Sequence, residues 1–361
     1  MFVAWRDLRS AKGRFALMGT VIVLITLLVG LLSGLTAGLA RENISAITGL
    51  PADRLAFAAP PADRGVSFTR SVVPRSAWRT WAGQPGVTAA APVGISTLNA
   101  SAGDRTATVS AFGTEPGSGV APADAELGPG RGVLSASAAE ELGVGVGDRV
   151  RIGPGELTVG AIAGDASYSH TPVVWTSLDD WRRFGGAGTG PGAGATVIAL
   201  TLEEGADLDA GDRAAGTRSV TIDEALTAIG SYQAENGSLQ LMRGFLFVIS
   251  ALVTGAFFTV WTIQRSGDVA VLKALGASTP YLLKDALGQA VLMLGVGTAA
   301  GTGLAAAIGI LISGGDVPFV LEASTVLGPA AVMIVLGVLG AALSIRRITA
   351  VDPLTALGSV R

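Results

Sequence analysis

Four long apolar runs restrict the fold of this chain more than any other feature of the sequence. They cover residues 15–40, 242–263, 282–312 and 325–345. An α-helix needs about 20 consecutive, mostly apolar residues to cross the bilayer core, and each run is long enough. Only 15% of the residues are charged, whereas soluble domains carry about 25%. The runs therefore predict an α-helical membrane protein with four transmembrane helices.

Residues 41–241, between the first two runs, have a different composition. Pro, Gly and charged residues occur throughout, and β-branched stretches such as residues 105–112 and 156–162 recur. Such stretches favour strands, and segments such as residues 135–142 favour short helices. The region is long enough to bury a core of its own. We therefore predict one large α+β extracytoplasmic domain between helices 1 and 2.

The basic residues predict the orientation in the membrane. They flank the runs at residues 6–14, 265–284 and 346–361, whereas the turn at residues 313–324 has no Lys or Arg. Lys and Arg are enriched in cytoplasmic segments, so both termini are predicted to be cytoplasmic. Residues 1–14 form a predicted amphipathic helix at the inner surface. The expected location is the bacterial cytoplasmic membrane, with membrane lipid around the spans.

Small residues follow one face of the first span. Gly30, Gly34 and Gly38 are four residues apart, and this spacing lets two membrane helices approach closely. The pattern predicts a helix-packing seam, with a second copy of the same helix as one possible partner.

The sequence contains no recognisable catalytic motif. There is no G-x-x-x-x-G-K-[ST] phosphate loop, no cysteine, and no H-E-x-x-H spacing around the single histidine, His170. These are the patterns that bind ATP phosphates or catalytic zinc. A net charge of −3 also gives no reason to expect nucleic acid. We expect no enzyme activity, no metal and no cofactor bound in this chain.

A short amphipathic segment, residues 264–281, separates the second and third runs. Its apolar residues recur near the helical period, and Gly276 and Pro280 end the pattern. By itself the pattern fits a helix lying on the membrane surface as well as a helix that docks onto a partner.

Two cytoplasmic motifs carry a family resemblance. Ala270 to Ser278 reads A-V-L-K-A-L-G-A-S, and residues 346–348 and 351–353 read R-R-I and V-D-P. Together they resemble the FtsX/MacB-type (type VII) ABC transporter permeases, in which the first motif is the coupling helix. The resemblance implies a permease homodimer and two copies of a separate ATPase subunit that binds ATP and Mg. The residues implied to contact the ATPase are Ala270, Leu272, Lys273, Leu275 and Gly276.

The first span and its flanks, residues 1–8, 13–15 and 32–35, look most like the haem-exporter and DevC-type branch of that family. This resemblance implies export of a hydrophobic substrate, haem in the first place, from the membrane or its outer leaflet. Haem iron takes His, Met, Tyr or Cys thiolate ligands, and a carboxylate is a further possible ligand. The candidate substrate-binding residues are Glu42, Tyr168, His170, Tyr232, Glu235 and Met242. An ordinary stalk helix also accounts for Tyr232 and Glu235, and lipid-facing packing for Met242.

Other functions remain open from the sequence. MacB- and LolC-like relatives export or extract lipids, lipoproteins or peptides. FtsX itself signals across the membrane to a cell-wall hydrolase. An anchored adhesin or sensor without an ATPase is a further alternative.

Overall fold

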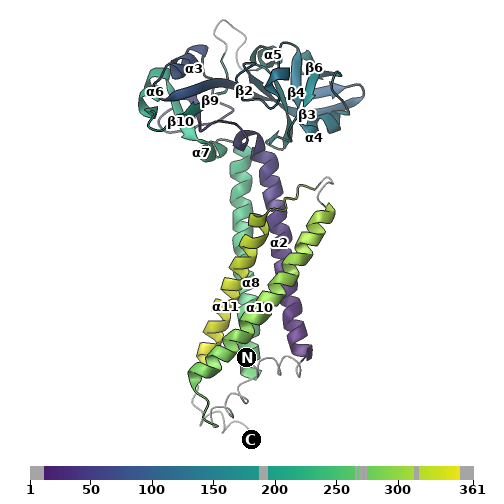
Figure 1. The fold of residues 1–361 in the computed structure, drawn as a ribbon, viewed down its shortest axis with the longest axis vertical. Coiled ribbons are helices and arrows are strands. Elements are labelled where there is room, and N and C mark those ends of the chain that lie inside the picture. Colours follow the sequence, from purple (N-terminus) through teal and green to yellow (C-terminus); the bar gives the residue numbers. More distant parts are fainter. Residues whose placement is uncertain are drawn as a thin grey trace. The chain divides into compact units, whose positions relative to one another are not determined.

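The computed structural model describes residues 12–186, 194–264, 267, 271, 275–312 and 317–349 (Figure 1). The chain forms two compact units: Leu39–Gly237 is one, and Met1–Gly38 with Ser238–Arg361 is the other. The candidate membrane-spanning segments are Ala16–Thr48, Gly230–Gln264, Pro280–Ile312 and Ala323–Leu343. The predicted fold class is confirmed, with four such helices among the described residues and a mixed domain between the first and second.

The long helices are α2 (Lys12–Thr48), α8 (Gly230–Gln264), α10 (Thr279–Ile312) and α11 (Ala323–Thr349). All four extend beyond the apolar runs that predicted them, and α2 and α8 extend the furthest. Helix α2 continues to Thr48, past residue 40, and α8 begins at Gly230, before residue 242. Hydropathy detects only the apolar part of a helix, so it could not predict these polar extensions.

The glycine seam of α2 packs inside the same chain. A Cβ at Gly30 would lie 2.8 Å from the Cβ of Ala305 on α10, and one at Gly34 would overlap the ring of Phe319. A Cβ at Gly38 would overlap the carbonyl of Pro318. Gly30, Gly34 and Gly38 therefore lie at close contacts of α2 with α10 and with the segment before α11. A second copy of α2 does not fit this face, because α10 and the segment before α11 occupy it.

We expect Gly34→Leu to destabilise the membrane unit by about 1–3 kcal/mol, because added side-chain atoms displace the Phe319 ring. Gly303→Leu is the matched control, since Gly303 on α10 is exposed and has no atom near its missing Cβ. Thermal unfolding of both variants in the same lipid nanodiscs measures the difference. Equal melting temperatures would show that the seam tolerates a side chain at Gly34.

Unit Leu39–Gly237 is built on one mixed sheet. Its strands are β1 (Arg54–Ala58), β2 (Val87–Ala102), β3 (Arg105–Thr114), β4 (Arg131–Leu134), β5 (Arg149–Ile152), β6 (Gly155–Ile162), β7 (Ser167–Tyr168), β8 (Thr171–Ser177), β9 (Val197–Leu202) and β10 (Thr217–Thr221). The order is β10-β1-β9-β2-β3-β8-β4-β6-β5, and β7 pairs with β8. The short helices are α3 (Arg75–Ala82), η1 (Asp124–Glu126), α4 (Ala136–Leu142), α5 (Leu178–Arg183), α6 (Leu208–Ala215) and α7 (Ile222–Leu226).

Strand β2 belongs to two parts of this sheet. Its first half pairs with β9, its second half pairs with β3, and Ala100 and Ser101 also pair with β5. The last pairing closes β2, β3, β8, β4, β6 and β5 into a ring of strands. Closure removes free sheet edges on this side of the unit. The enclosed core includes Leu134, Val150, Ile152 and Leu157.

The other edge of the sheet, β10, is blocked by side chains. The Ser219 N–H donates to Asp212 Oδ2 at 2.9 Å, and the Thr221 N–H donates to Glu224 Oε2 at 2.9 Å. The Thr221 backbone bond lowers the pKa of the Glu224 carboxyl. Thr221 Oγ1 accepts the Glu224 N–H in return, which forms a capping box at the start of α7. These donors are therefore not available for pairing with an added strand.

Candidate functional site

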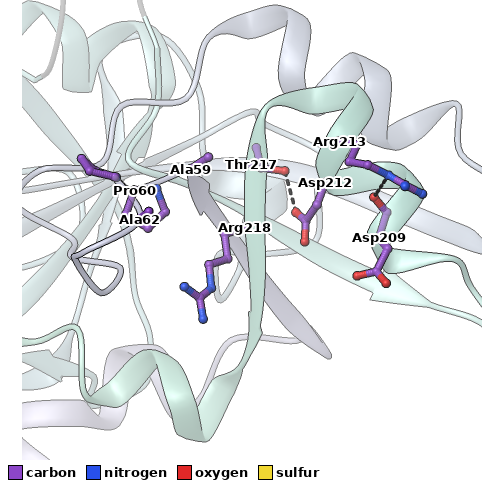
Figure 2. Close-up of a pocket in the computed structure, with 9 residues that line it drawn as sticks. Ala59, Pro60, Ala62, Asp209, Asp212, Arg213, Thr217 and Arg218 are labelled. Atoms are coloured by element: carbon purple, nitrogen blue, oxygen red, sulfur yellow. Dashed lines mark hydrogen bonds between the residues drawn. The ribbon is translucent and has the colours of Figure 1, made fainter.

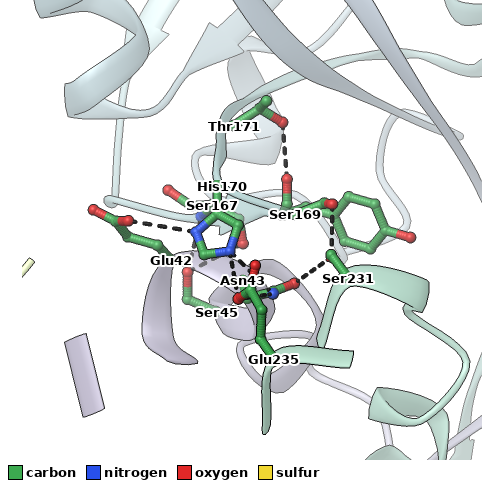
Figure 3. Close-up of polar contacts among 10 residues, drawn as sticks. Glu42, Asn43, Ser45, Ser167, Ser169, His170, Thr171, Ser231 and Glu235 are labelled. Carbon is green, nitrogen blue, oxygen red and sulfur yellow. Dashed lines mark hydrogen bonds and ion pairs between the residues drawn. The ribbon is translucent and has the colours of Figure 1, made fainter. Parts of the chain in front are cut away.

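A polar cluster forms where three segments of unit Leu39–Gly237 meet (Figure 3). The segments are the last turns of α2, β7 with the turn that follows it, and the first two turns of α8. The cluster consists of Glu42, Asn43, Ser45, Ser167, Ser169, His170, Ser231 and Glu235. The chain segments that carry it are thus the polar ends of two helices that continue into apolar runs.

The turn between β7 and β8 is strained. Ser167 pairs with Pro172 and Tyr168 with Thr171, so only Ser169 and His170 form the turn. Both have positive φ, 50° and 62°, where glycine or asparagine is the usual residue. The left-handed conformation costs a non-glycine residue roughly 1–2 kcal/mol. Strain of this kind at a polar surface motivates a functional hypothesis.

Main-chain bonds fasten this turn to α2. The Ser169 N–H donates to the Asn43 carbonyl at 3.0 Å, and the His170 N–H donates to the Glu42 carbonyl at 3.2 Å. Ser45 Oγ also accepts the Ser167 N–H at 2.8 Å. The backbone of the turn is thus held independently of the His170 side chain.

The His170 ring lies between two carboxylates (Figure 3). Its Nε2 is 2.8 Å from Glu235 Oε2, and its Nδ1 is 3.6 Å from Glu42 Oε2. The His170 side chain is 30% exposed and the two glutamates are 45% and 44% exposed. The carboxylates face opposite nitrogens of the ring, so they do not converge on one point. In the described part of the chain, no three His, Cys, Asp or Glu residues are arranged to hold a metal ion.

Asn43 completes the network from a buried position. Its Nδ2 donates to Glu235 Oε2 at 3.2 Å, and its Oδ1 accepts from Ser231 Oγ at 3.0 Å. Ser231 Oγ is also 2.8 Å from Ser169 Oγ. Asn43 is 1% exposed, and a buried amide with its hydrogen bonds satisfied fixes the geometry around it. The start of α8 is therefore held against both α2 and the turn.

The structure brings together three of the six predicted substrate-binding residues: Glu42, His170 and Glu235. Tyr168 does not join them. It is 7% exposed, its ring lies 5.7 Å from the rings of Phe68 and Phe112, and burial raises the pKa of its phenol. Its assignment as a ligand is corrected here, because the phenol belongs to the core of the unit.

The remaining two predicted ligands have separate places. Tyr232 packs, partly buried, against the same core as Tyr168. Met242 lies further along α8, is 51% exposed and belongs to the other unit. Asn43, Ser169 and Ser231 were missed by the sequence analysis. The Arg41-Glu42-Asn43 run directly after an apolar span is the one signal that pointed to Asn43.

The predicted coupling segment is described only in part. Ala270, Leu272 and Lys273 lie outside the described residues. Leu275 is 80% exposed, and its N–H donates to the Val271 carbonyl at 3.0 Å. Gly276 follows with a φ of 94°, the conformation that commonly ends a helix after its last turn. An exposed leucine before a helix-ending glycine is compatible with docking, and ATPase contact stays a prediction.

A shallow hollow of about 400 Å³ lies beside β10 (Figure 2). Pro60, Asp212, Arg213 and Arg218 are among its lining residues. Asp212 Oδ1 accepts from Thr217 Oγ1 at 2.8 Å, and its Oδ2 binds Ser219. Arg213 Nε donates to the Asp209 carbonyl at 3.0 Å. Asp212 thus holds α6 against the sheet edge, and the Arg213 bond lies within α6. The polar cluster around His170 is therefore the stronger candidate site.

Comparison with known proteins assigns both parts of the chain. Residues 15–218 match the family model of the MacB-like periplasmic core domain, and residues 241–353 match that of the FtsX-like permease C-terminal region. "Putative hemin transport system permease protein HrtB" of Staphylococcus epidermidis is 25% identical over 99% of both chains. The protein of the same name from Staphylococcus haemolyticus is 39% identical over 39% of this chain and 40% of its own.

A solved structure is also similar. The periplasmic region of MacB from Actinobacillus actinomycetemcomitans matches with a TM-score of 0.37 and 12% sequence identity. The match covers 51% of this chain and 95% of that one.

Proposed function

Because this chain belongs to the FtsX/MacB-type family of ABC transporter permeases, we propose that it couples ATP hydrolysis by a separate ATPase subunit to export of haem from the membrane. The full-length similarity to proteins named as hemin transport permeases supports the choice of substrate. The observation that carries the proposal is the meeting of Glu42, His170 and Glu235 in one cluster.

The chemistry of this cluster suits haem iron. An imidazole nitrogen is a common axial ligand, and carboxylates nearby tune the ligand and its charge. The cluster lies on the polar ends of α2 and α8, directly beyond the apolar parts of two candidate spans. In the proposed orientation, with both termini cytoplasmic, this is the outer boundary of the membrane. Haem that has partitioned into the outer leaflet would meet these side chains there.

The proposed transporter contains two copies of the permease and two ATPase subunits. Closure of the ATPases on ATP and Mg would move the segment of residues 264–281 and with it α8 and α10, which flank that segment. Leu275 is the described residue that we place in the ATPase groove, since an apolar side chain 80% exposed loses water on docking. Catalysis of ATP hydrolysis is assigned to the partner.

The deciding experiment is the ATPase rate of the permease–ATPase complex in lipid nanodiscs, with and without haem. We expect haem to stimulate hydrolysis and to give a ligated-haem absorbance spectrum. If the complex forms and haem changes neither signal, the permease role remains and haem is the wrong substrate. Lipid that co-purifies and stimulates the ATPase in place of haem would favour lipid extraction. If no ATPase associates, the coupling role fails.

A further inference from the structure

Two carboxylates contact different nitrogens of the His170 ring, and Asn43 Nδ2 also lies 3.2 Å from Nε2. Nε2 is 2.8 Å from Glu235 Oε2, while Nδ1 is 3.6 Å from Glu42 Oε2. A ring nitrogen that binds iron has no hydrogen to donate. The Nε2–Glu235 hydrogen bond and iron ligation through Nε2 therefore exclude each other.

We propose that His170 is the haem-iron ligand through Nε2 and that Glu235 competes for this nitrogen, with Glu42 orienting the ring from behind. This assignment rests on the proposed haem export and specifies its binding residue. The ligating form of the ring carries its hydrogen on Nδ1, on the side of Glu42. A carboxylate behind a ligating histidine fixes the ring orientation and increases its basicity.

The backbone of the turn allows the ring to change partner without unfolding. Main-chain bonds to the carbonyls of Asn43 and Glu42 hold Ser169 and His170 in place, and neither bond involves the imidazole. The ring is 30% exposed, so a ligand can approach it. The strained turn holds His170 at a fixed position beside the last turns of α2.

Glu235 keeps a partner when the ring leaves. Asn43 Nδ2 donates to the same oxygen, Oε2, at 3.2 Å, so the carboxylate is not left without a hydrogen bond. Release of His170 also removes one link between the turn and α8, while the Ser169–Ser231 contact at 2.8 Å remains. Haem binding would thereby change the contacts at the start of α8, which continues into the second span.

The test is a haem titration of the full-length chain in nanodiscs, followed by the Soret absorbance band, with four variants. His170→Ala and His170→Gln should lose the histidine-ligated spectrum, and glutamine keeps an amide that can donate to Glu235. Glu42→Gln should weaken haem binding about 10- to 100-fold, as loss of the partner of a metal-ligating histidine does. Glu235→Gln should tighten it several-fold, because a neutral amide holds Nε2 less strongly than a carboxylate.

Metal-free protoporphyrin IX is the control ligand, and melting temperatures show that the variants are folded. The assignment is overturned if wild type binds haem and stimulates the ATPase while folded His170→Gln gives the same spectrum. It is also overturned if wild type binds haem and metal-free protoporphyrin IX with equal affinity, because iron ligation then contributes nothing to binding. If wild type ignores haem altogether, the proposed substrate and this assignment fail together.

Discussion

Leu275→Asp should leave the permease folded and reduce haem-stimulated ATP hydrolysis to the rate of the ATPase alone. Leu275 is 80% exposed, and exposed positions away from special features change stability by about 0.5 kcal/mol or less. In the proposed complex the same side chain is buried in the ATPase groove, where a carboxylate without a partner is costly to desolvate. The effect should therefore appear in assembly and not in folding.

Leu275→Met is the matched control, since methionine keeps the volume and apolar character of leucine. Co-purification of the ATPase with each variant, and hydrolysis rates with and without haem, give two independent readings. If Leu275→Asp assembles and hydrolyses ATP like wild type, residues 264–281 lie on the membrane surface and do not couple. Reduced expression of both variants would instead indicate a structural role for the exposed leucine.

The large-scale fold could be predicted because it depends on long, redundant signals. A run of more than 20 apolar residues leaves few alternatives to a membrane span, and α2, α8, α10 and α11 follow from it directly. The closure of β5 onto β2 could not be predicted in the same way. It depends on pairing between strands far apart in the chain, of which Ala100 and Ile152 are one example, and no local pattern encodes such a pair.

The candidate site was predictable in its chemistry more than in its geometry. Glu42 and Glu235 are titratable residues near the ends of apolar runs, and His170 is the single histidine of the sequence. These positions could be identified from the sequence. Tyr168 precedes His170 by two positions, yet strand alternation points its ring into the core. Asn43 gave little signal, because its role depends on being buried between α8 and the turn.

The glycines show the same limit. The spacing of Gly30, Gly34 and Gly38 predicts close packing, but spacing does not identify the neighbour. The structure supplies Ala305, Pro318 and Phe319, which belong to the same chain. A proposed homodimer therefore needs a different face, and the seam no longer supports it.

Trp181→Ala should destabilise unit Leu39–Gly237 by about 3–5 kcal/mol, the usual cost of removing a large buried aromatic side chain. The Trp181 side chain is fully buried, and the missing Cβ positions of Gly94, Gly113 and Gly186 all lie against it. Gly94 and Gly113 face each other across β2 and β3, so the indole from α5 covers the junction of the two strands. Its removal leaves a cavity that these glycines cannot fill.

A double-mutant cycle makes this prediction specific. Gly94→Ala should cost about 1–3 kcal/mol in wild type, because its Cβ would overlap the indole ring of Trp181. The cost should be much smaller in the Trp181→Ala background, which lacks that ring. Trp181→Phe should be milder than Trp181→Ala, because phenylalanine keeps an aromatic ring in the site and leaves a smaller cavity. Neither variant loses a hydrogen bond of the indole N–H, which has no partner among the described residues. Hydrogen exchange of β2 and β3 in the full-length protein measures the stability of wild type, the glycine variant, Trp181→Ala, the double variant and Trp181→Phe. Additive costs for Gly94→Ala and Trp181→Ala would show that Gly94 does not form part of the indole site. Because β8 pairs with β3 and begins directly after the Ser169–His170 turn, loss of this packing should also lower protection at Thr171 and Val173.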